Sequence, residues 1–147
     1  MNLNNLNDEY LLFLKRHERY FLKSDNTWTH GGCLTLAFSL REWLDNSYCH
    51  NIKILGVFNK QQIEHVVVSF NDQYIIDGYG IHMKDKFLSF YEQKENLLNL
   101  RLDRFKMEQA IDNGLVHVDY ISQAMIDLLM KEMGPFSLGV EINPFGL

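Results

Sequence analysis

A cysteine, a histidine and an aspartate follow one another in an order that suits nucleophilic catalysis: Cys33, His65 and Asp77. A thiol nucleophile needs a base that takes its proton and a third group that orients the base. Cys33 follows Gly31 and Gly32, which let the backbone bend sharply, and it opens a mostly apolar stretch that predicts a helix. The N–H groups and the dipole at the start of a helix favour the reactive thiolate. We therefore predict a catalytic triad of Cys33, His65 and Asp77.

The predicted helix at about 33–46 is apolar on most of its sides, which indicates a central helix rather than a surface one. Packing around such a helix would hold its N-terminus rigidly, as a nucleophile requires. Three strand-like runs follow at 51–58, 63–70 and 73–77, rich in β-branched and aromatic residues. Because the breaks between these runs are short, we expect an antiparallel meander.

The loop between the second and third strands decides whether the histidine and the aspartate can meet. A two-residue loop at 71–72 would place His65 and Asp77 on opposite faces of the hairpin. A three-residue loop at 71–73 places Asp77 opposite Val67, one diagonal step from His65 and on the same face. A β-bulge would have the same effect. The triad therefore requires a three-residue loop or a bulge.

Each of these residues also has a purely structural interpretation. His65 would be a core histidine bonded to a carbonyl group, and Asp77 would simply begin the turn into Gly78. An ionisable pair inside a hairpin rich in valine and isoleucine is costly to bury unless the two groups pair or serve a purpose. We therefore prefer the triad.

The length of 147 residues predicts one domain spanning 1–147, and a hydrophobic fraction of 46% is typical of a folded protein. The net charge of −5 argues against nucleic acid or an acidic membrane as a partner. Two cysteines are too few for a disulfide framework and lack metal-type spacing. The N-terminus lacks a signal-peptide pattern, and no apolar run could span a bilayer. We expect a cytoplasmic protein with free thiols; its oligomeric state is not indicated.

Helical patterns flank the predicted sheet on both sides in the sequence. We predict helices at 7–23, with Asn7 as the N-cap, and at 84–98, 105–112 and 119–133, followed by an irregular tail at 136–147. The expected fold is α+β: a central helix carrying the cysteine packs on a small antiparallel sheet, with additional helices in the C-terminal half. The core would span about 25–80, and the helical C-terminal part about 84–134.

The segment 25–80 resembles the papain-like superfamily of cysteine enzymes. The resemblance rests on Gly32-Cys33 at the start of a helix, on Glu64-His65-Val66-Val67-Val68, and on Tyr74-Ile75-Ile76-Asp77. The compact branch with Cys, His and Asp in that order, as in transglutaminase-like and arylamine N-acetyltransferase-like cores, is the closer match. The glutamine that precedes the nucleophile in papain is absent, as is the aromatic residue that commonly follows the histidine in transglutaminase-like cores.

The resemblance implies acyl transfer from an amide or ester to Cys33, with His65 as base and Asp77 as the group that orients it. It also implies an oxyanion hole made by the Cys33 backbone N–H and one further donor. Candidates for that donor or for substrate contacts lie in the preceding loop and after the third strand: Asn26, Trp28, Thr29, His30, Gly32 and Tyr79. His30 has three interpretations: it lowers the thiol pKa, lines the entrance, or faces solvent. For Tyr79, packing is the alternative.

The function that we expect is that of a small cytosolic thiol-dependent hydrolase or acyl transferase acting on a peptide, isopeptide or side-chain amide. Its partner would be a protein or peptide substrate, with no cofactor. Cys33, His65, Asp77 and His82 have metal-ligand side chains, but they lack paired spacing, so we expect no metal. The alternative is a non-catalytic binding or inhibitor protein that keeps the papain-like fold; the Asn-, Lys- and Ile-rich composition is compatible with a phage-encoded protein of this kind.

Overall fold

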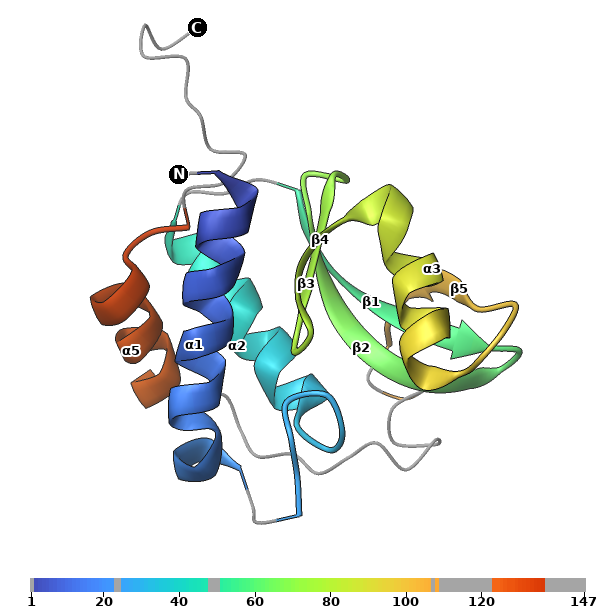
Figure 1. Cartoon of the computed structure of the whole chain (residues 1–147), viewed down its shortest axis with the longest axis horizontal. Coiled ribbons are helices and arrows are strands. Elements are labelled where there is room, and N and C mark those ends of the chain that lie inside the picture. The colour runs from blue at the N-terminus through green and yellow to red at the C-terminus, as the bar shows by residue number, and fades with distance from the viewer. Residues whose placement is uncertain (1, 23–24, 48–50, 107, 109–122, 137–147) are drawn as a thin grey trace, which may run out of the picture.

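The computed structural model describes residues 2–22, 25–47, 51–106, 108 and 123–136. Within them the fold is α+β, with four helices and one five-stranded antiparallel sheet in the order β4-β3-β2-β1-β5 (Figure 1). The helices are α1 (Leu3–Phe21), α2 (Cys33–Asn46), α3 (Lys84–Glu95) and α5 (Gln123–Met133). The strands are β1 (Ile52–Asn59), β2 (Gln62–Phe70), β3 (Tyr74–Asp77), β4 (Gly80–Met83) and β5 (Arg101–Arg104). No helix within these residues is both long enough and apolar enough to cross a bilayer.

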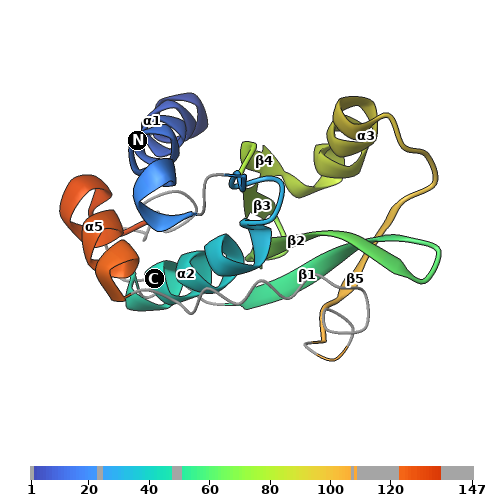
Figure 2. The same cartoon turned by 90° about the horizontal axis from the view of Figure 1, so that it is seen from below.

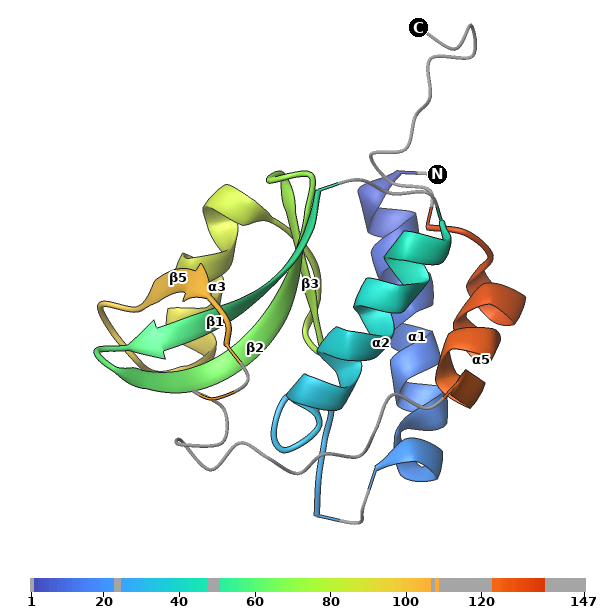
Figure 3. The same cartoon turned by 180° about the vertical axis from the view of Figure 1, so that it is seen from behind.

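The helices cover both faces of the sheet. Figures 1 and 3 show α1, α2 and α5 side by side on one side of the sheet and α3 on the other. The view in Figure 2 separates the same layers. Strand residues alternate between these two cores, as the pleat requires. Val66 and Val68 of β2 face α2, whereas Val67 faces the buried Phe87 and Tyr91 of α3.

The central helix α2 matches the prediction at both ends, and it is buried along most of its length. Trp43 and Leu40 are fully buried within the larger core, and the indole N–H of Trp43 donates to the carbonyl oxygen of Gly134. A helix packed on this many sides against β1, β2 and α5 keeps its N-terminus in a fixed position. Cys33 is the first residue of that helix.

The register of the hairpin formed by β2 and β3 confirms the three-residue loop. Phe70 pairs with Tyr74, and the residues between them form the loop Asn71-Asp72-Gln73. Asn71 and Asp72 both have positive φ values, 57° and 51°, which asparagine and aspartate tolerate better than most residues. The register therefore places His65 and Asp77 on the same face.

Several predicted elements differ from the structure. The first helix begins at Leu3 rather than at Asn7, with Asn2 as its N-cap; the side chain of Asn7 instead accepts a hydrogen bond from the backbone N–H of Ile81. The sheet has two more strands, β4 and β5, than the three predicted. Both are only four residues long, and β5 is largely exposed, so neither has a hydrophobic pattern that sequence analysis could recognise.

Some predictions fall on residues that the structure does not describe. The helix predicted at 105–112 and the start of the helix predicted at 119–133 lie largely outside the described residues, as does the tail after residue 136. Cys49 also lies outside them. The described part of the last helix, Gln123–Met133, ends where the sequence predicts.

Candidate active site

Cys33 lies at a sharp bend where a loop turns into α2. Gly31 has a φ of 90°, in the left-handed region, and an added Cβ there would collide with the side chain of Asn26. An added Cβ on Gly32 would lie 2.6 Å from the carbonyl oxygen of Thr27. Both glycines are therefore required by the loop. The helix has no side-chain N-cap, so its first N–H groups are left to stabilise negative charge near Cys33.

His65 and Asp77 form a buried ion pair beside this bend. Nε2 of His65 lies 2.9 Å from Oδ2 of Asp77, and the two side chains are 0% and 1% exposed. The buried carboxylate holds the ring in one orientation, so that the other nitrogen, Nδ1, is the one that can exchange a proton with a thiol. Nδ1 is buried and has no hydrogen-bond partner of ordinary geometry among the described residues.

The Cys33 thiol reaches His65 at the edge of the sheet. The ring of His65 lies on the α3 side, whereas α2 packs on the opposite face. Pairing between β2 and β3 ends at Val68 and Ile76, so the first half of β2 has no neighbouring strand on that side. Cys33 lies against this open edge, where the thiol interacts with the His65 ring and with the backbone of Val66. Because β3 stops pairing with β2 at Val68, Cys33 from the α2 face can approach His65 on the α3 face across this open edge.

The electrostatics of the three groups favour a thiolate–imidazolium pair. Burial alone would raise the pKa of Cys33, but hydrogen bonding and charge from His65, with the backbone of Val66 and of Cys33 itself, outweigh burial and lower it. Burial alone would lower the pKa of His65, but Asp77 and Cys33 raise it to about 9. Burial would raise the pKa of Asp77, yet the two histidines that it contacts lower it to about 2. Each shift stabilises the charged form.

A second histidine, His82 on β4, binds the other oxygen of the same aspartate. Its Nε2 lies 2.9 Å from Oδ1 of Asp77, and the backbone N–H groups of Tyr79 and Gly80 donate to that oxygen at 2.9 and 3.1 Å. Because Asp77 is ionised and cannot donate, Nε2 of His82 carries the proton. In the sequence, His82 stood out only as a residue with a metal-ligand side chain. Its role depends on β4, a strand that the sequence did not reveal.

Replacing Tyr10 with phenylalanine is expected to lower the free energy of unfolding by about 1–3 kcal/mol. The buried Tyr10 hydroxyl donates to the carbonyl oxygen of Asp77 at 2.7 Å, and the substitution leaves that carbonyl without this donor. Urea denaturation measures the change. Tyr20→Phe is the matched control, since Tyr20 is 76% exposed. Equal stability of the two variants would contradict the prediction.

Aromatic side chains cover the buried pair. The ring of Tyr91, on α3, is stacked on His65 with centroids 5.0 Å apart and planes 15° apart. Tyr79 lies edge-on to Tyr91 and 6.4 Å from His65. The Tyr79 hydroxyl donates to Glu95 at the end of α3. Tyr79, a candidate for substrate contact, therefore lies beside His65 and Tyr91, whereas nothing in the sequence marked Tyr91 as a site residue.

The loop candidates for the second oxyanion donor are engaged elsewhere. Trp28 is buried; its indole N–H donates to the carbonyl oxygen of Leu14, and its backbone N–H donates to Glu18. Thr29 interacts through its hydroxyl with Thr27 at 3.3 Å and with Nδ1 of His30 at 3.0 Å. The side chain of Asn26 packs against Gly31, as described above.

His30 faces solvent for most of its side chain, as one of its three interpretations expects. Its side chain is 65% exposed, and Nε2 lies 3.4 Å from Oε1 of Glu95. Glu95 thus contacts both the loop before Cys33, through His30, and the turn after β3, through Tyr79. These contacts connect α3 to the loop that precedes Cys33 and to the turn that follows Asp77.

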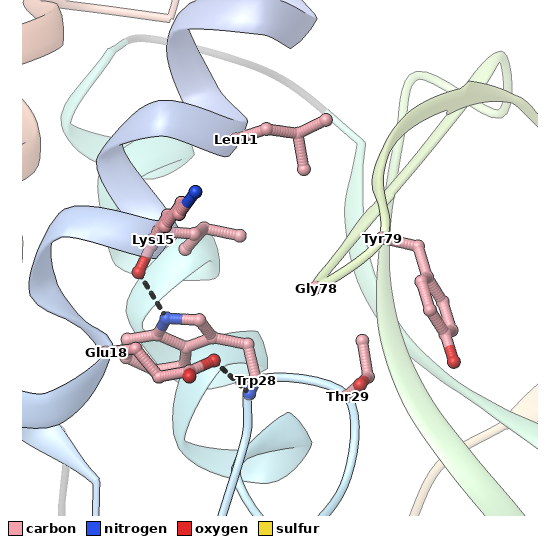
Figure 4. Close-up of a pocket in the computed structure, with 8 residues that line it drawn as sticks. Leu11, Lys15, Glu18, Trp28, Thr29, Gly78 and Tyr79 are labelled. Carbon is pink, nitrogen blue, oxygen red and sulfur yellow. Dashed lines mark hydrogen bonds between the residues drawn. The ribbon is translucent and has the colours of Figure 1, made fainter.

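A pocket of about 270 Å³ lies behind the turn that carries Gly78 and Tyr79 (Figure 4). Its walls come from α1, including Leu11 and Lys15, and from Trp28 and Thr29 of the loop. The Tyr79 ring points away from this pocket in Figure 4. The pocket is therefore separated from the His65 side of the turn.

Among the described residues, no group of three or more histidine, cysteine, aspartate or glutamate side chains is arranged to hold a metal ion. The described geometry is instead that of a carboxylate bonded to two imidazoles, with the Cys33 thiol near enough to the His65 imidazole for each group to shift the pKa of the other. Comparisons of the chain with protein-family models, with curated proteins and with solved structures found no match.

Proposed function

We propose that this chain is a thiol-dependent hydrolase or acyl transferase that acts on a peptide, isopeptide or side-chain amide. One observation carries the proposal: the Cys33 thiol, at the start of a helix, interacts with an imidazole whose other nitrogen is held by a buried carboxylate. A nucleophile, a base and an orienting group in this relation are the requirement for covalent acyl transfer. The lowered thiol pKa and the raised histidine pKa agree with that role.

The reaction that we propose has two stages. The Cys33 thiolate attacks the carbonyl carbon, a carbon–sulfur bond forms, and the carbonyl oxygen takes the negative charge. The oxyanion collapses, the carbon–nitrogen bond breaks, and the His65 imidazolium gives its proton to the leaving amine. Water or an amine, deprotonated by His65, then attacks the thioester and releases the thiol. Asp77 holds the imidazole and stabilises its cation throughout.

We also propose that the chain is related in fold to the papain-like superfamily, in its compact Cys–His–Asp branch. The order of elements supports this: a helix begins with the cysteine, and neighbouring antiparallel strands carry the histidine and the aspartate. Free thiols are compatible with a reducing compartment such as the cytoplasm. The substrate would be a protein or peptide.

Selective alkylation tests the nucleophile. At pH 6, iodoacetamide is expected to label Cys33 much faster than Cys49, because His65 lowers the pKa of the Cys33 thiol. Peptide mass spectrometry after timed quenching measures both rates in one sample. Cys49→Ala should keep the fast phase, and Cys33→Ala should lose it. Equal and slow labelling of the two cysteines would contradict the proposal.

The alternative, a non-catalytic binding or inhibitor protein, is favoured by the burial of the centre. His65 is fully buried and Cys33 is 7% exposed, with Tyr91 stacked over the imidazole. Acylation distinguishes the two functions: p-nitrophenyl acetate should acetylate Cys33 of the wild type and turn over if the chain is an enzyme. A thiol that is alkylated but never acylated would favour the binding protein.

A further inference from the structure

His82 is bonded directly to the triad, yet the proposed mechanism gives it no part. It lies on β4, which pairs with β3, and its Nε2 is 2.9 Å from Oδ1 of Asp77. Its side chain is 12% exposed, and its ring packs against Phe87 and Phe90 of α3 at centroid distances of 5.1 and 4.9 Å. The ring is therefore held with its Nε2–H on the carboxylate, and that N–H is present whether the imidazole is neutral or charged.

Orienting the carboxylate does not by itself require His82. The backbone N–H groups of Tyr79 and Gly80 donate to the same oxygen at 2.9 and 3.1 Å, from the turn that directly follows Asp77. Within the described part of the chain, the side chains bonded to this carboxylate are His65 on Oδ2 and His82 on Oδ1. Against the effect of burial, these two histidines hold the pKa of Asp77 at about 2. His82 therefore contributes chiefly to keeping Asp77 ionised.

The charge that faces Asp77 changes during the proposed reaction. In the resting protein the carboxylate faces the His65 imidazolium, which is its counter-ion. Once that imidazolium has given up its proton, the ring is neutral and Asp77, 1% exposed, is a buried anion without a cation on Oδ2. Burying an anion in this state is costly unless other donors compensate its charge. His82, on the other oxygen, is the side chain placed to do this.

We propose that His82 is a positioning residue that acts through Asp77 in the second stage of the reaction, where its Nε2–H stabilises the carboxylate while His65 is neutral. This inference rests on the proposed function. In that stage a water oxygen bonds to the thioester carbon as Nδ1 of His65 takes a proton from the water. The oxyanion then collapses, the carbon–sulfur bond breaks, and the carboxylic acid and the Cys33 thiolate are released. The proton on His82 does not move; an ionised Asp77 stabilises the imidazolium that forms.

Burst kinetics with p-nitrophenyl acetate separate the two stages. The burst of p-nitrophenolate measures acylation of Cys33, and the steady rate that follows measures hydrolysis of the thioester. In His82→Leu the steady rate should fall about 10-fold, which is the scale of one lost hydrogen bond to a charged group. The burst rate should stay within about threefold of wild type, because p-nitrophenolate leaves without a proton and Asp77 still faces the imidazolium at the start. Mass spectrometry of the quenched protein follows the acetylated form directly.

Two further variants separate the donor from the bulk of the ring. His82→Gln places an amide N–H near the position of Nε2, so its steady rate should stay within about threefold of wild type. His82→Met has an unbranched apolar side chain and no donor, so it should resemble His82→Leu and replaces it if leucine prevents folding. Urea denaturation shows whether each variant is folded under the conditions of the assay.

His17→Leu is the matched control, since His17 on α1 also pairs through Nε2 with a carboxylate, that of Glu132, and its side chain is 16% exposed. It should leave both rates unchanged. An unchanged steady rate in the donor-free variants would overturn the inference, as would an equal fall of the burst and steady rates or a failure of glutamine to keep the steady rate. A wild type that is not acetylated, or whose thioester reacts with neither water nor added glycinamide, would overturn the proposed function and the role of His82 with it.

Discussion

Replacing His65 with alanine is expected to slow the alkylation of Cys33 at pH 6 by about 100-fold or more. In the native protein the imidazole, together with the backbone of Val66 and of Cys33, outweighs the effect of burial on the thiol pKa. Without it, burial raises the pKa of Cys33 above its ordinary value, and very little thiolate remains in mild acid. The measurement is the pH profile of iodoacetamide labelling from pH 5 to 10. Wild type should keep a plateau into the acidic range, whereas the variant should rise steeply with pH.

His30→Ala is the matched control for that substitution. His30 is 65% exposed and lies three residues before Cys33, so it tests whether a nearby histidine of any kind suffices. We expect the profile of this variant to resemble that of wild type. A His65→Ala protein that keeps the acidic plateau would show that the helix N-terminus alone lowers the thiol pKa, and the triad would then be wrong.

Replacing Asp77 with asparagine is expected to reduce acylation of Cys33 by about 1,000-fold. In the native protein Oδ1 of Asp77 accepts from three N–H groups, and Oδ2 accepts from His65. Asparagine would replace one of these oxygens by an amide nitrogen, which cannot accept a hydrogen bond. The amide nitrogen would therefore face His65 and donate to Nε2. The imidazole proton would then move to Nδ1, and the ring could not take a proton from the thiol. The acylation rate measures the loss of activity. The thiolate absorbance measures separately whether His65 still takes the proton of the thiol.

The same substitution should also destabilise the fold, by on the order of 3 kcal/mol, because it breaks a buried ion pair. Asp72→Asn is the matched control: Asp72 lies in the adjacent loop, where its side chain is 52% exposed and contacts Lys53 and Lys84. This exposed aspartate should tolerate the change with little loss of stability or acylation. Equal losses of stability and acylation in the two variants would contradict the prediction that the buried Asp77 contributes more to both than an exposed aspartate does.

The pH dependence of stability follows from the same pair. The pKa of His65 is about 9 in the folded protein and 6.5 for an unperturbed histidine, so its contribution is complete below about pH 6.5 and is lost as the pH rises through 9. The pKa of Asp77 is about 2 when folded and 3.8 unperturbed, so its contribution is present above about pH 3.8 and is lost as the pH falls through 2. The melting temperature of the wild type should therefore fall as the pH rises from 6 to 10. In Asp77→Asn the fall over the same range should be smaller.

The features that depend on a local pattern could be predicted from the amino-acid sequence. The run of apolar residues after Cys33 specified the buried helix α2, and alternation with short polar breaks specified β1, β2 and β3. Counting along the hairpin showed that a three-residue loop would put His65 and Asp77 on one face and a two-residue loop would not, because side chains in a strand alternate with a period of two; the register in the structure is that of the three-residue loop. Local periodicity was enough for these features since each is set by residues close together in the chain.

The distant groups that surround His65 and Asp77 became known only from the packing of the folded chain. His82 reaches Asp77 because a two-residue turn at 78–79 folds β4 back beside β3. Tyr91 reaches His65 because α3 packs on the face of the sheet opposite α2. The contacts that engage Trp28, with Leu14 and Glu18, likewise come from another element. These relations depend on how helices pack across a sheet, and the spacing of residues along the chain carries no record of that packing.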